Sequence, residues 1–348
     1  MKRVVVVLVA TTLLLAAAAS AIYYSAAGQD AVFRRLATVV MDPGAPDTFD
    51  GLRVVVCGSA SPLGNNPDRA QACIAVVTPE HFLLFDVGAG SVARMRQAQL
   101  PMARVTGVFL THFHSDHIAS LPDVNLNSWV AGRKDNLDVY GPPGIDSVIE
   151  GFNLAYALDR RYRVKHHGED LLPPGAGPMH AVDITPGDVA WQDNLLKVTS
   201  FEVNHSPVWP AVGYRVDYRG RSVVISGDTN ASENLFVAAK NADLLLHDAL
   251  SRTLLDPMIT TAREANQSRM AKIMTDVIDY HADSTSIEAR AREAGVRQLV
   301  LYHLVPVPMN ALTEKMFSRG LASTTILARD LQTFDLPTDS TQINIREP

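Results

Sequence analysis

The segment THFHSDH at residues 111–117 holds four potential metal ligands within six positions. It directly follows residues 105–110, an apolar run typical of a buried strand. In an extended chain, residues i and i+2 point the same way, so His112 and His114 can bind one ion. After a turn of the chain, Asp116 and His117 can face a second ion. An apolar core rarely tolerates so many unpaired polar groups, so the pattern predicts a metal-binding segment.

Three further candidate ligands each follow an apolar, strand-like run: His205 after 198–203, Asp228 after 223–226 and His303 after 299–302. The ends of neighbouring strands meet at one edge of a sheet, so these side chains can join the segment 111–117. Two metal ions about 3.5–4 Å apart would activate a shared water for hydrolysis. The expected cofactors are two Zn²⁺ ions, or other divalent transition metals, with His112, His114 and His205 on one, Asp116, His117 and His303 on the other, and Asp228 bridging both.

The elements that must position these ligands form two similar halves. Turn signals separate the apolar runs, and strand meanders followed by strand–helix alternation occur twice, which predicts two sheets with helices outside. Residues 160–193 are interpreted as a surface excursion, and no interior linker divides residues 51–348, which we expect to form one hydrolase domain. Strands are expected at 52–57, 73–78, 82–85, 105–110, 137–140, 195–203, 212–218, 223–226, 243–247 and 298–302, and helices at 91–99, 119–132, 147–158, 232–240, between 261 and 280, and at 286–294.

The first 24 residues have the pattern of a targeting segment. Lys2 and Arg3 precede an uncharged apolar run over residues 4–24, and the small residues 19–21 offer a cleavage site after Ala21. A cleaved signal peptide and a retained N-terminal membrane anchor both fit this pattern. Residues 25–50 are expected to be a linker. The chain is therefore predicted to be exported, either periplasmic or anchored to the outer face of the cytoplasmic membrane by residues 4–24.

The composition is that of a globular protein and disfavours a nucleic-acid partner. Of the 348 residues, 47% are hydrophobic and 20% charged, and the formal net charge is −6. Because the chain has no block of Lys or Arg to neutralise phosphates, the expected partner is a small-molecule ester substrate and not a nucleic acid. The sequence leaves the oligomeric state open, a dimer included. It also leaves open whether Cys57 and Cys73 form a bridge or remain two buried thiols.

Over residues 52–308 the chain resembles the metallo-β-lactamase superfamily. The resemblance rests on the order of four motifs: His-x-His-x-Asp-His, a later His, Gly-Asp-Thr at 227–229 and a final strand-end His. This resemblance implies an α/β fold, an αββα sandwich of two mixed β-sheets flanked by helices, with a dinuclear metal site at one edge. Residues 85–90 (FDVGAG) are similar to the superfamily's Asp-x-Gly element. Asp86 would then orient a metal ligand without binding metal itself.

Within the superfamily, the motifs are most similar to the ribonuclease Z and arylsulfatase-like branch. They are CGSASP at 57–62, LLLHDA at 244–249 in place of the branch's His-Glu-Ala motif, and YHADST at 280–285 in place of its His-Ser-Thr element. The resemblance implies that His247 is the general acid, with Asp248 beside it, and that His281 lines or orients the site or caps a helix. The chain lacks the basic, Gly-rich arm with which ribonuclease Z grips tRNA, so tRNA processing is not expected.

These observations predict an exported dinuclear-zinc hydrolase that acts on a small anionic ester, an aryl sulfate or a phosphodiester. A metal-bound hydroxide would attack, with Asp116 holding its proton and His247 protonating the leaving group. The alternatives are a lactonase or other carboxylic ester or amide hydrolase, and a non-catalytic metal-binding envelope protein. Trp129, Trp209 and Tyr214 flank the ligand segments and are either an aryl-binding pocket or ordinary core.

Overall fold

The computed structural model describes residues 2–41 and 49–348. Residues 1–48 and 49–348 form two separate compact units, of which the second is called the C-terminal domain here. Within the first, the stretch 6–24 is long and apolar enough to cross a membrane, by length and composition alone. The first unit contains helices α1 (Lys2–Tyr24) and α2 (Ala26–Met41).

Helix α2 differs from the linker expected over residues 25–50. Val32, Leu36 and Val39 recur at three- and four-residue spacing, which suits a helix. The turn signals at 42–47 that suggested a tether lie outside the described residues. All buried apolar side chains of the described residues belong to the C-terminal domain.

Two mixed sheets make up the centre of the C-terminal domain. In each sheet antiparallel strands occupy one part and parallel strands the other, as expected where meanders precede strand–helix units. The first sheet has the order β15 (Asn344–Arg346), β14 (Thr333–Pro337), β1 (Gly51–Gly58), β2 (Cys73–Val77), β3 (Phe82–Phe85), β4 (Gly107–Phe109), β5 (Leu137–Gly141), β6 (Met179–Asp183). The second has the order β13 (Ile326–Leu327), β12 (Gln298–Val305), β11 (Leu244–Leu250), β10 (Arg221–Ile225), β9 (Val208–Tyr218), β8 (Leu196–His205), β7 (Val189–Gln192).

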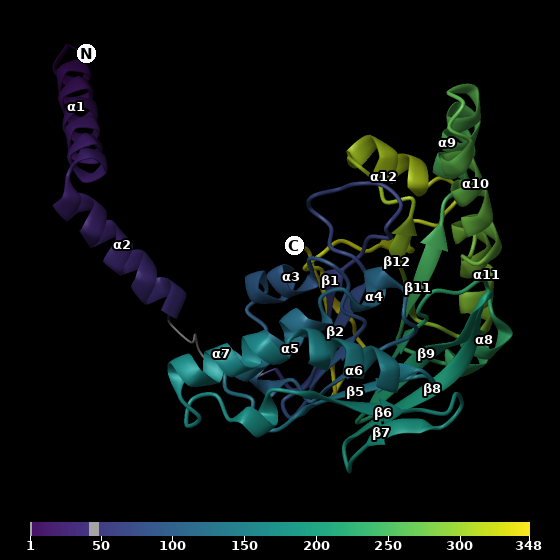
Figure 1. The fold of residues 1–348 in the computed structure, drawn as a ribbon. Helices are drawn as coiled ribbons and strands as arrows, with labels where there is room; N and C mark the ends of the chain where they lie inside the picture. Colours follow the sequence, from purple (N-terminus) through teal and green to yellow (C-terminus); the bar gives the residue numbers. More distant parts are fainter. Residues whose placement is uncertain (1, 42–48) are drawn as a thin grey trace. The chain divides into compact units, whose positions relative to one another are not determined.

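Helices cover the outer face of each sheet (Figure 1). Apolar side chains of α3, α5 and α6 pack on the first sheet, and those of α8, α11 and α12 pack on the second. The predicted αββα sandwich of two mixed β-sheets flanked by helices is therefore confirmed. The helices of the domain are α3 (Ser91–Gln97), α4 (Ser115–Ile118), α5 (Leu121–Val130), α6 (Ile145–Ala155), α7 (Ala157–His167), α8 (Glu233–Ala238), α9 (Arg252–Glu264), α10 (Ser268–Asp276), α11 (Ser284–Glu293) and α12 (Ala311–Phe317).

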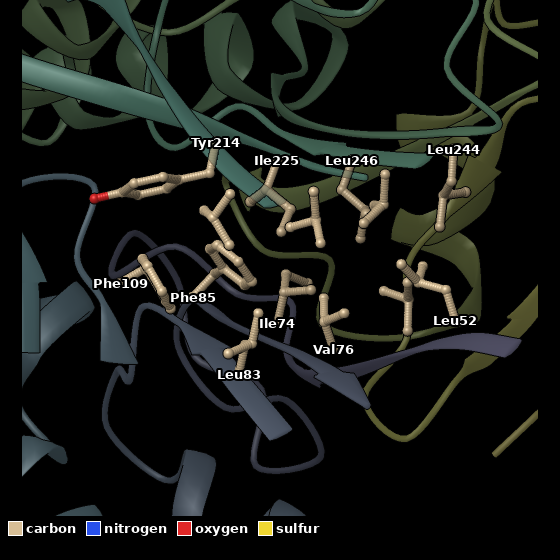
Figure 2. Close-up of a cluster of buried hydrophobic side chains, with 14 of the residues drawn as sticks. Leu52, Ile74, Val76, Leu83, Phe85, Phe109, Tyr214, Ile225, Leu244 and Leu246 are labelled. Carbon is tan, nitrogen blue, oxygen red and sulfur yellow. The ribbon is translucent and has the colours of Figure 1, made fainter. Parts of the chain in front are cut away.

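The main core lies between the two sheets and supports the strand end that precedes the metal-binding segment (Figure 2). Phe109 of β4 stacks on Phe85, with ring centroids 5.1 Å apart, and meets the ring of Tyr214 from β9 edge-on. The hydroxyl of Tyr214 donates a 2.7 Å hydrogen bond to the carbonyl oxygen of Leu110. The second sheet thus holds the end of β4 in place directly before residue 111.

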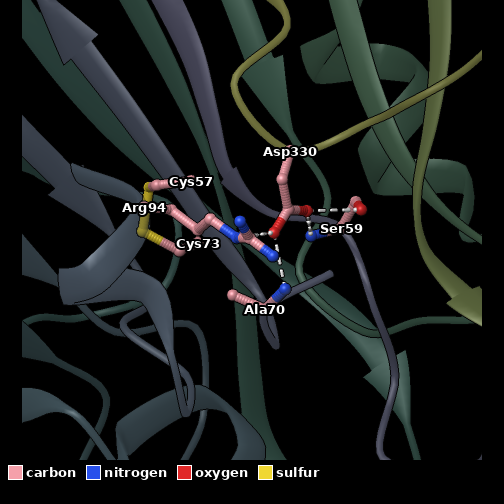
Figure 3. Close-up of a disulfide and its surroundings, with 6 residues drawn as sticks. All are labelled: Cys57, Ser59, Ala70, Cys73, Arg94 and Asp330. Carbon is pink, nitrogen blue, oxygen red and sulfur yellow. Dashed lines mark hydrogen bonds and ion pairs between the residues drawn. A yellow bond between two sulfur atoms is a disulfide. The ribbon is translucent and has the colours of Figure 1, made fainter. Parts of the chain in front are cut away.

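A disulfide and a buried carboxylate hold the loop between β1 and β2 (Figure 3). Cys57 and Cys73, whose pairing the sequence left open, are bridged. The Asp330 carboxylate accepts hydrogen bonds from the backbone N–H groups of Ser59 and Ala70 and from the Ser59 hydroxyl. Both ends of the loop are therefore fixed to the body of the domain.

Residues 160–193 differ from the predicted surface excursion. Helix α7 extends to His167, and β6 and β7 extend the two sheets at their edges. β6 pairs in parallel with β5, with Leu137 opposite Met179, and β7 pairs with β8. These edge strands carry few buried residues, which is why hydrophobic periodicity did not reveal them.

Candidate metal centre

Five separate parts of the fold bring the candidate ligands together. The segment after β4 carries His112 and His114, and the first turn of α4 carries Asp116 and His117. The remaining three lie in the second sheet or just past one of its strands: His205 is the last residue of β8, Asp228 follows β10, and His303 lies near the end of β12. Contacts between the two sheets therefore complete the site.

The structure gathers all seven predicted ligands into two overlapping groups. In each group the candidate ligand atoms lie within 4.8 Å of one another, and Asp228 belongs to both. This is the arrangement that a bridging carboxylate requires. One group is His112, His114, His205 and Asp228, and the other is Asp116, His117, Asp228 and His303.

The polar atoms that face one another in these groups lack enough protein partners. Nε2 of His112, Nε2 of His117, Nδ1 of His303 and Oδ1 of Asp228 are buried without a hydrogen-bond partner among the described residues. Buried polar atoms are rarely left unpaired, because desolvating them costs free energy. Imidazole nitrogens and carboxylate oxygens at this spacing fit divalent transition metals such as Zn²⁺. The donor set therefore fits the two ions that this chemistry requires.

Burial and neighbouring charges shift the pKa values of the ligands in different directions. Burial alone would lower the pKa values of His117 and His303, but Asp228 and Asp116 raise both. Burial lowers the pKa of His112 well below its usual value, which keeps its imidazole neutral. For Asp228, burial alone would raise the pKa, but His117 and His303 hold it well below its usual range. The pKa of Asp116 falls to about 2 for the same reason, since His117 and His303 outweigh its burial. Neutral imidazole and ionised carboxylate are the forms that bind metal.

Asp86 orients the segment without belonging to either group. One of its carboxylate oxygens accepts from the backbone N–H of Thr111, and the other accepts from the Thr111 hydroxyl and from Nδ1 of His117, all at 2.8 Å. The hydrogen bond to Nδ1 leaves Nε2 of His117 pointing at Asp228, 3.3 Å from its Oδ2. This is the role that the Asp-x-Gly resemblance implied.

Replacing Asp86 with Asn is expected to weaken metal binding without removing any ligand. An amide can satisfy the hydrogen bonds from Thr111 or from His117 but loses the negative charge, so the imidazole becomes a weaker and less ordered ligand. Loss of such a partner typically costs about 10–100-fold in metal affinity. Competition against a zinc chelator measures this change. Unchanged affinity would contradict the orienting role.

Gly227 allows the chain to bring Asp228 against the first sheet. It has φ +62°, and a Cβ at this position would lie 2.7 Å from Cβ of Thr111 and 2.9 Å from the carbonyl oxygen of Val212. Both the backbone conformation and the close contact thus require glycine. The Gly-Asp-Thr motif is therefore explained by the approach of β10 to the segment after β4.

His247, the general acid implied by the resemblance, lies outside both ligand groups. Its side chain is fully buried and packs on Phe236. Nδ1 donates to the backbone carbonyl oxygen of Asp248 at 2.7 Å, and Nε2 has no partner among the described residues. A substrate cannot reach this imidazole in the described conformation.

His281 lies beside the metal-binding residues, at a position from which it can donate a proton. Its Nδ1 donates a 2.7 Å hydrogen bond to Oδ2 of Asp248, and its ring centroid is 5.4 Å from those of His205 and His303. His281 and Asp248 also form a third group with Asp228 and His303. The Asp248 carboxylate thus serves His281 more directly than His247. In the sequence, only the resemblance of residues 280–285 to the His-Ser-Thr element pointed to His281. The fold shows that His281, and not His247, lies beside the metal ligands.

The aromatic residues flanking the ligand segments do not form an aryl-binding pocket. Trp129 and Tyr214 are buried and donate hydrogen bonds to backbone carbonyl groups, as core aromatics do. Trp209 is 76% exposed. The accessible space beside the metal centre is instead a cavity of about 410 Å³, whose lining includes His114, His205, Val208 and Tyr280.

Comparison with known proteins agrees with the fold and the ligand order. The family described as "Beta-lactamase superfamily domain" matches residues 81–304. This chain belongs to the metallo-β-lactamase superfamily, a class of hydrolases whose fold typically binds two zinc ions. The resemblance inferred from the motifs is thereby confirmed.

Among curated proteins, the chain is similar to mycobacterial enzymes named ribonuclease Z. It is 33% identical over 281 residues to that of Mycobacterium bovis BCG Pasteur, covering 80% of this chain and 94% of that protein. For the Mycobacterium marinum protein the values are 32%, 78% and 92%. Among solved structures, human tRNase Z, short form, matches with a TM-score of 0.56 and 20% identity over 82% of this chain and 99% of that one. A metallo-β-lactamase-fold protein of Bacillus subtilis matches with a TM-score of 0.60 and 17% identity, over 82% and 98%.

These relatives correct the expected substrate and partner. The prediction of a small anionic ester, an aryl sulfate above all, with no nucleic-acid partner, is contradicted by relatives that are ribonucleases. The same similarity also contradicts the two alternatives, a lactonase and a non-catalytic metal-binding protein. The physical error was to infer the partner from net charge: a scissile phosphate is bound locally by metal ions, whatever the sign of the remaining surface.

Proposed function

We propose that this chain is a metal-dependent phosphodiesterase that cleaves RNA. The observation that carries the proposal is the similarity to ribonuclease Z, which extends over 80% of this chain and 94% of the M. bovis protein. The two overlapping ligand groups support it, because phosphodiester hydrolysis is well served by two ions that bind one phosphate.

Residues of the two ligand groups have different roles in the proposed reaction. When bound, two zinc ions would supply an activated water and neutralise the charge that develops on the phosphate. Asp228 holds the two halves of the centre together, because its carboxylate faces both. Asp116 remains an ionised acceptor, with Oδ2 3.0 Å from Nε2 of His303, and can hold a proton of the attacking water.

We assign the general acid to His281 in preference to His247. The Asp248 carboxylate accepts a hydrogen bond from Nδ1 of His281 and so fixes the orientation of the ring. Among the described residues none hydrogen-bonds Nε2 of His281, so this atom can donate a proton to the departing ribose oxygen. Cleavage would then leave a hydroxyl on one RNA fragment and a phosphate on the other.

Export of the chain stays a proposal. The apolar stretch 6–24 and the disulfide between Cys57 and Cys73 support it, because disulfides persist mainly in oxidising compartments. The fate of residues 1–24 is not decided by these features. N-terminal sequencing of the protein from its native membrane and soluble fractions would distinguish a cleaved signal from a retained anchor.

The test of the proposed function is cleavage of a defined RNA by the purified, zinc-quantified protein. We expect a precursor tRNA or an unstructured oligoribonucleotide to be cut at discrete positions, with activity removed by a chelator and restored by Zn²⁺. An oligodeoxyribonucleotide of the same sequence is the control for RNA preference. A fully metal-loaded protein that leaves both RNAs intact would overturn the proposal.

A further inference from the structure

Helices α6 and α7 carry a surface that the metal centre does not use. None of the 11 residues of α7 is buried, although it follows α6 directly and packs on the domain (Figure 1). A groove of about 1080 Å³ runs along the two helices. Its lining contains none of the metal ligands and none of the residues around His281.

An exposed apolar stripe lines this groove. Leu154, Leu158 and Tyr162 are 77%, 51% and 63% exposed. Residues spaced four apart in near-continuous helices point to the same side, so the three side chains form one continuous strip. Soluble proteins rarely leave large apolar side chains grouped in this way unless they contact a partner or a membrane.

Two unpaired cations flank the stripe. Arg161 and Lys165 line the same groove, and neither has an ion pair or hydrogen bond within the described part of the chain. The neighbouring Arg160 donates to the carbonyl oxygen of Asn153, and Arg163 pairs with Asp159. The groove is also lined by Glu169, but Arg160, Arg161 and Lys165 outnumber it, so the net charge beside the apolar side chains is positive in a chain whose formal net charge is −6.

This combination fits an anionic lipid surface better than RNA or a second copy of the chain. Phosphates of RNA would bind Arg161 and Lys165 but would leave Leu154 and Leu158 in water. A two-fold symmetric dimer through this face would bring the same cations together and repel. A bilayer surface accepts both groups, since leucine and tyrosine enter the interface while arginine and lysine bind lipid phosphates.

We propose that the α6–α7 groove docks the C-terminal domain on the surface of an anionic membrane. The candidate membrane-crossing stretch at 6–24 supports a membrane environment, but docking by this face does not depend on it. The proposal is also independent of the RNA-cleaving function, because no catalytic residue lies in the groove. Docking would hold the domain against the bilayer in one orientation.

The test uses residues 49–348, which contain all of the described core and both ligand groups. Sedimentation with vesicles of phosphatidylcholine, with and without phosphatidylglycerol, measures binding. We expect binding to the vesicles that contain phosphatidylglycerol, weakened by salt. The double substitution R161Q/K165Q should weaken it about 30-fold, since each cation near such a surface contributes roughly a factor of five.

The apolar half of the proposal has its own variant and matched control. L154S/L158S should weaken vesicle binding about tenfold or more, whereas V237S/L312S should leave it unchanged. Val237 and Leu312 are 66% and 67% exposed but lie outside the groove. Metal content and thermal unfolding of each variant check that the fold is intact. Wild-type binding by the groove variants, or no preference for phosphatidylglycerol, overturns the proposal, as does a loss of RNA binding alone in R161Q/K165Q.

Discussion

Replacing Asp228 with Asn should remove activity and the second metal equivalent together. Asp228 is the one residue shared by both ligand groups, and it is 3% exposed, with Oδ1 lacking a hydrogen-bond partner among the described residues. An amide keeps the shape but loses the charge that offsets two divalent ions. Losing several kcal/mol of charge stabilisation corresponds to a fall of about 10³-fold or more in kcat/KM.

Metal analysis and RNA cleavage must be measured on the same preparation. Asp123→Asn on α5 is the matched control, because it makes the same chemical change at an exposed carboxylate outside the centre. Raising the Zn²⁺ concentration should restore part of the metal content of D228N but little of its activity. A D228N protein with two bound ions and normal turnover would contradict the bridging role.

Replacing His281 with Ala should lower kcat for RNA while leaving the metal content intact. Its imidazole contacts Asp248 and lies beside His205 and His303, but the two groups of predicted ligands do not need it. Losing a general acid typically costs about 10²–10⁴-fold. The loss should be small for an aryl phosphodiester with an acidic phenol, because such a leaving group departs without protonation.

His247→Ala is the matched control, since this histidine also contacts Asp248 but is fully buried. It should lower the free energy of unfolding by creating a cavity, with little effect on the ratio of RNA to aryl phosphodiester turnover. Asp248→Asn should follow His281→Ala in direction, because a neutral amide replaces the carboxylate that orients the ring through Nδ1. If H247A instead shows the selective loss on RNA, the two histidines exchange roles.

The ligands could be predicted from sequence because each stands in or just after a strong local signal. The apolar runs before His112, His205, Asp228 and His303 identify strands, and strand ends meet at sheet edges whatever the loops do. The same periodicity predicted two sheets with helices outside, and the resemblance to the superfamily implied the αββα sandwich. By contrast, β6 and β7 carry few buried residues and were interpreted as an excursion, while the turn signals at 42–47 led residues 25–50, which include α2, to be interpreted as a linker.

The substrate class could not be obtained from composition. Formal charge averages over the whole chain, whereas two metal ions would define the charge at the centre. The absence of a basic Gly-rich arm therefore does not exclude RNA. The predicted substrate class was corrected by the similarity to ribonuclease Z, which covers most of the length of those relatives.

The sequence by itself determined the seven candidate ligands, their division into two groups and the sandwich that carries them, because these depend on residue type and local periodicity. The tertiary structure decided which histidine meets the centre, that Cys57 and Cys73 pair, and where an apolar stripe stays uncovered. His247 and His281 lie more than 30 positions apart and both contact Asp248, His247 at the backbone carbonyl oxygen and His281 at the carboxylate. Which of the two histidines faces the metal ligands depends on how β11 packs against the segment before α11. That contact is not determined by the local sequence around either histidine.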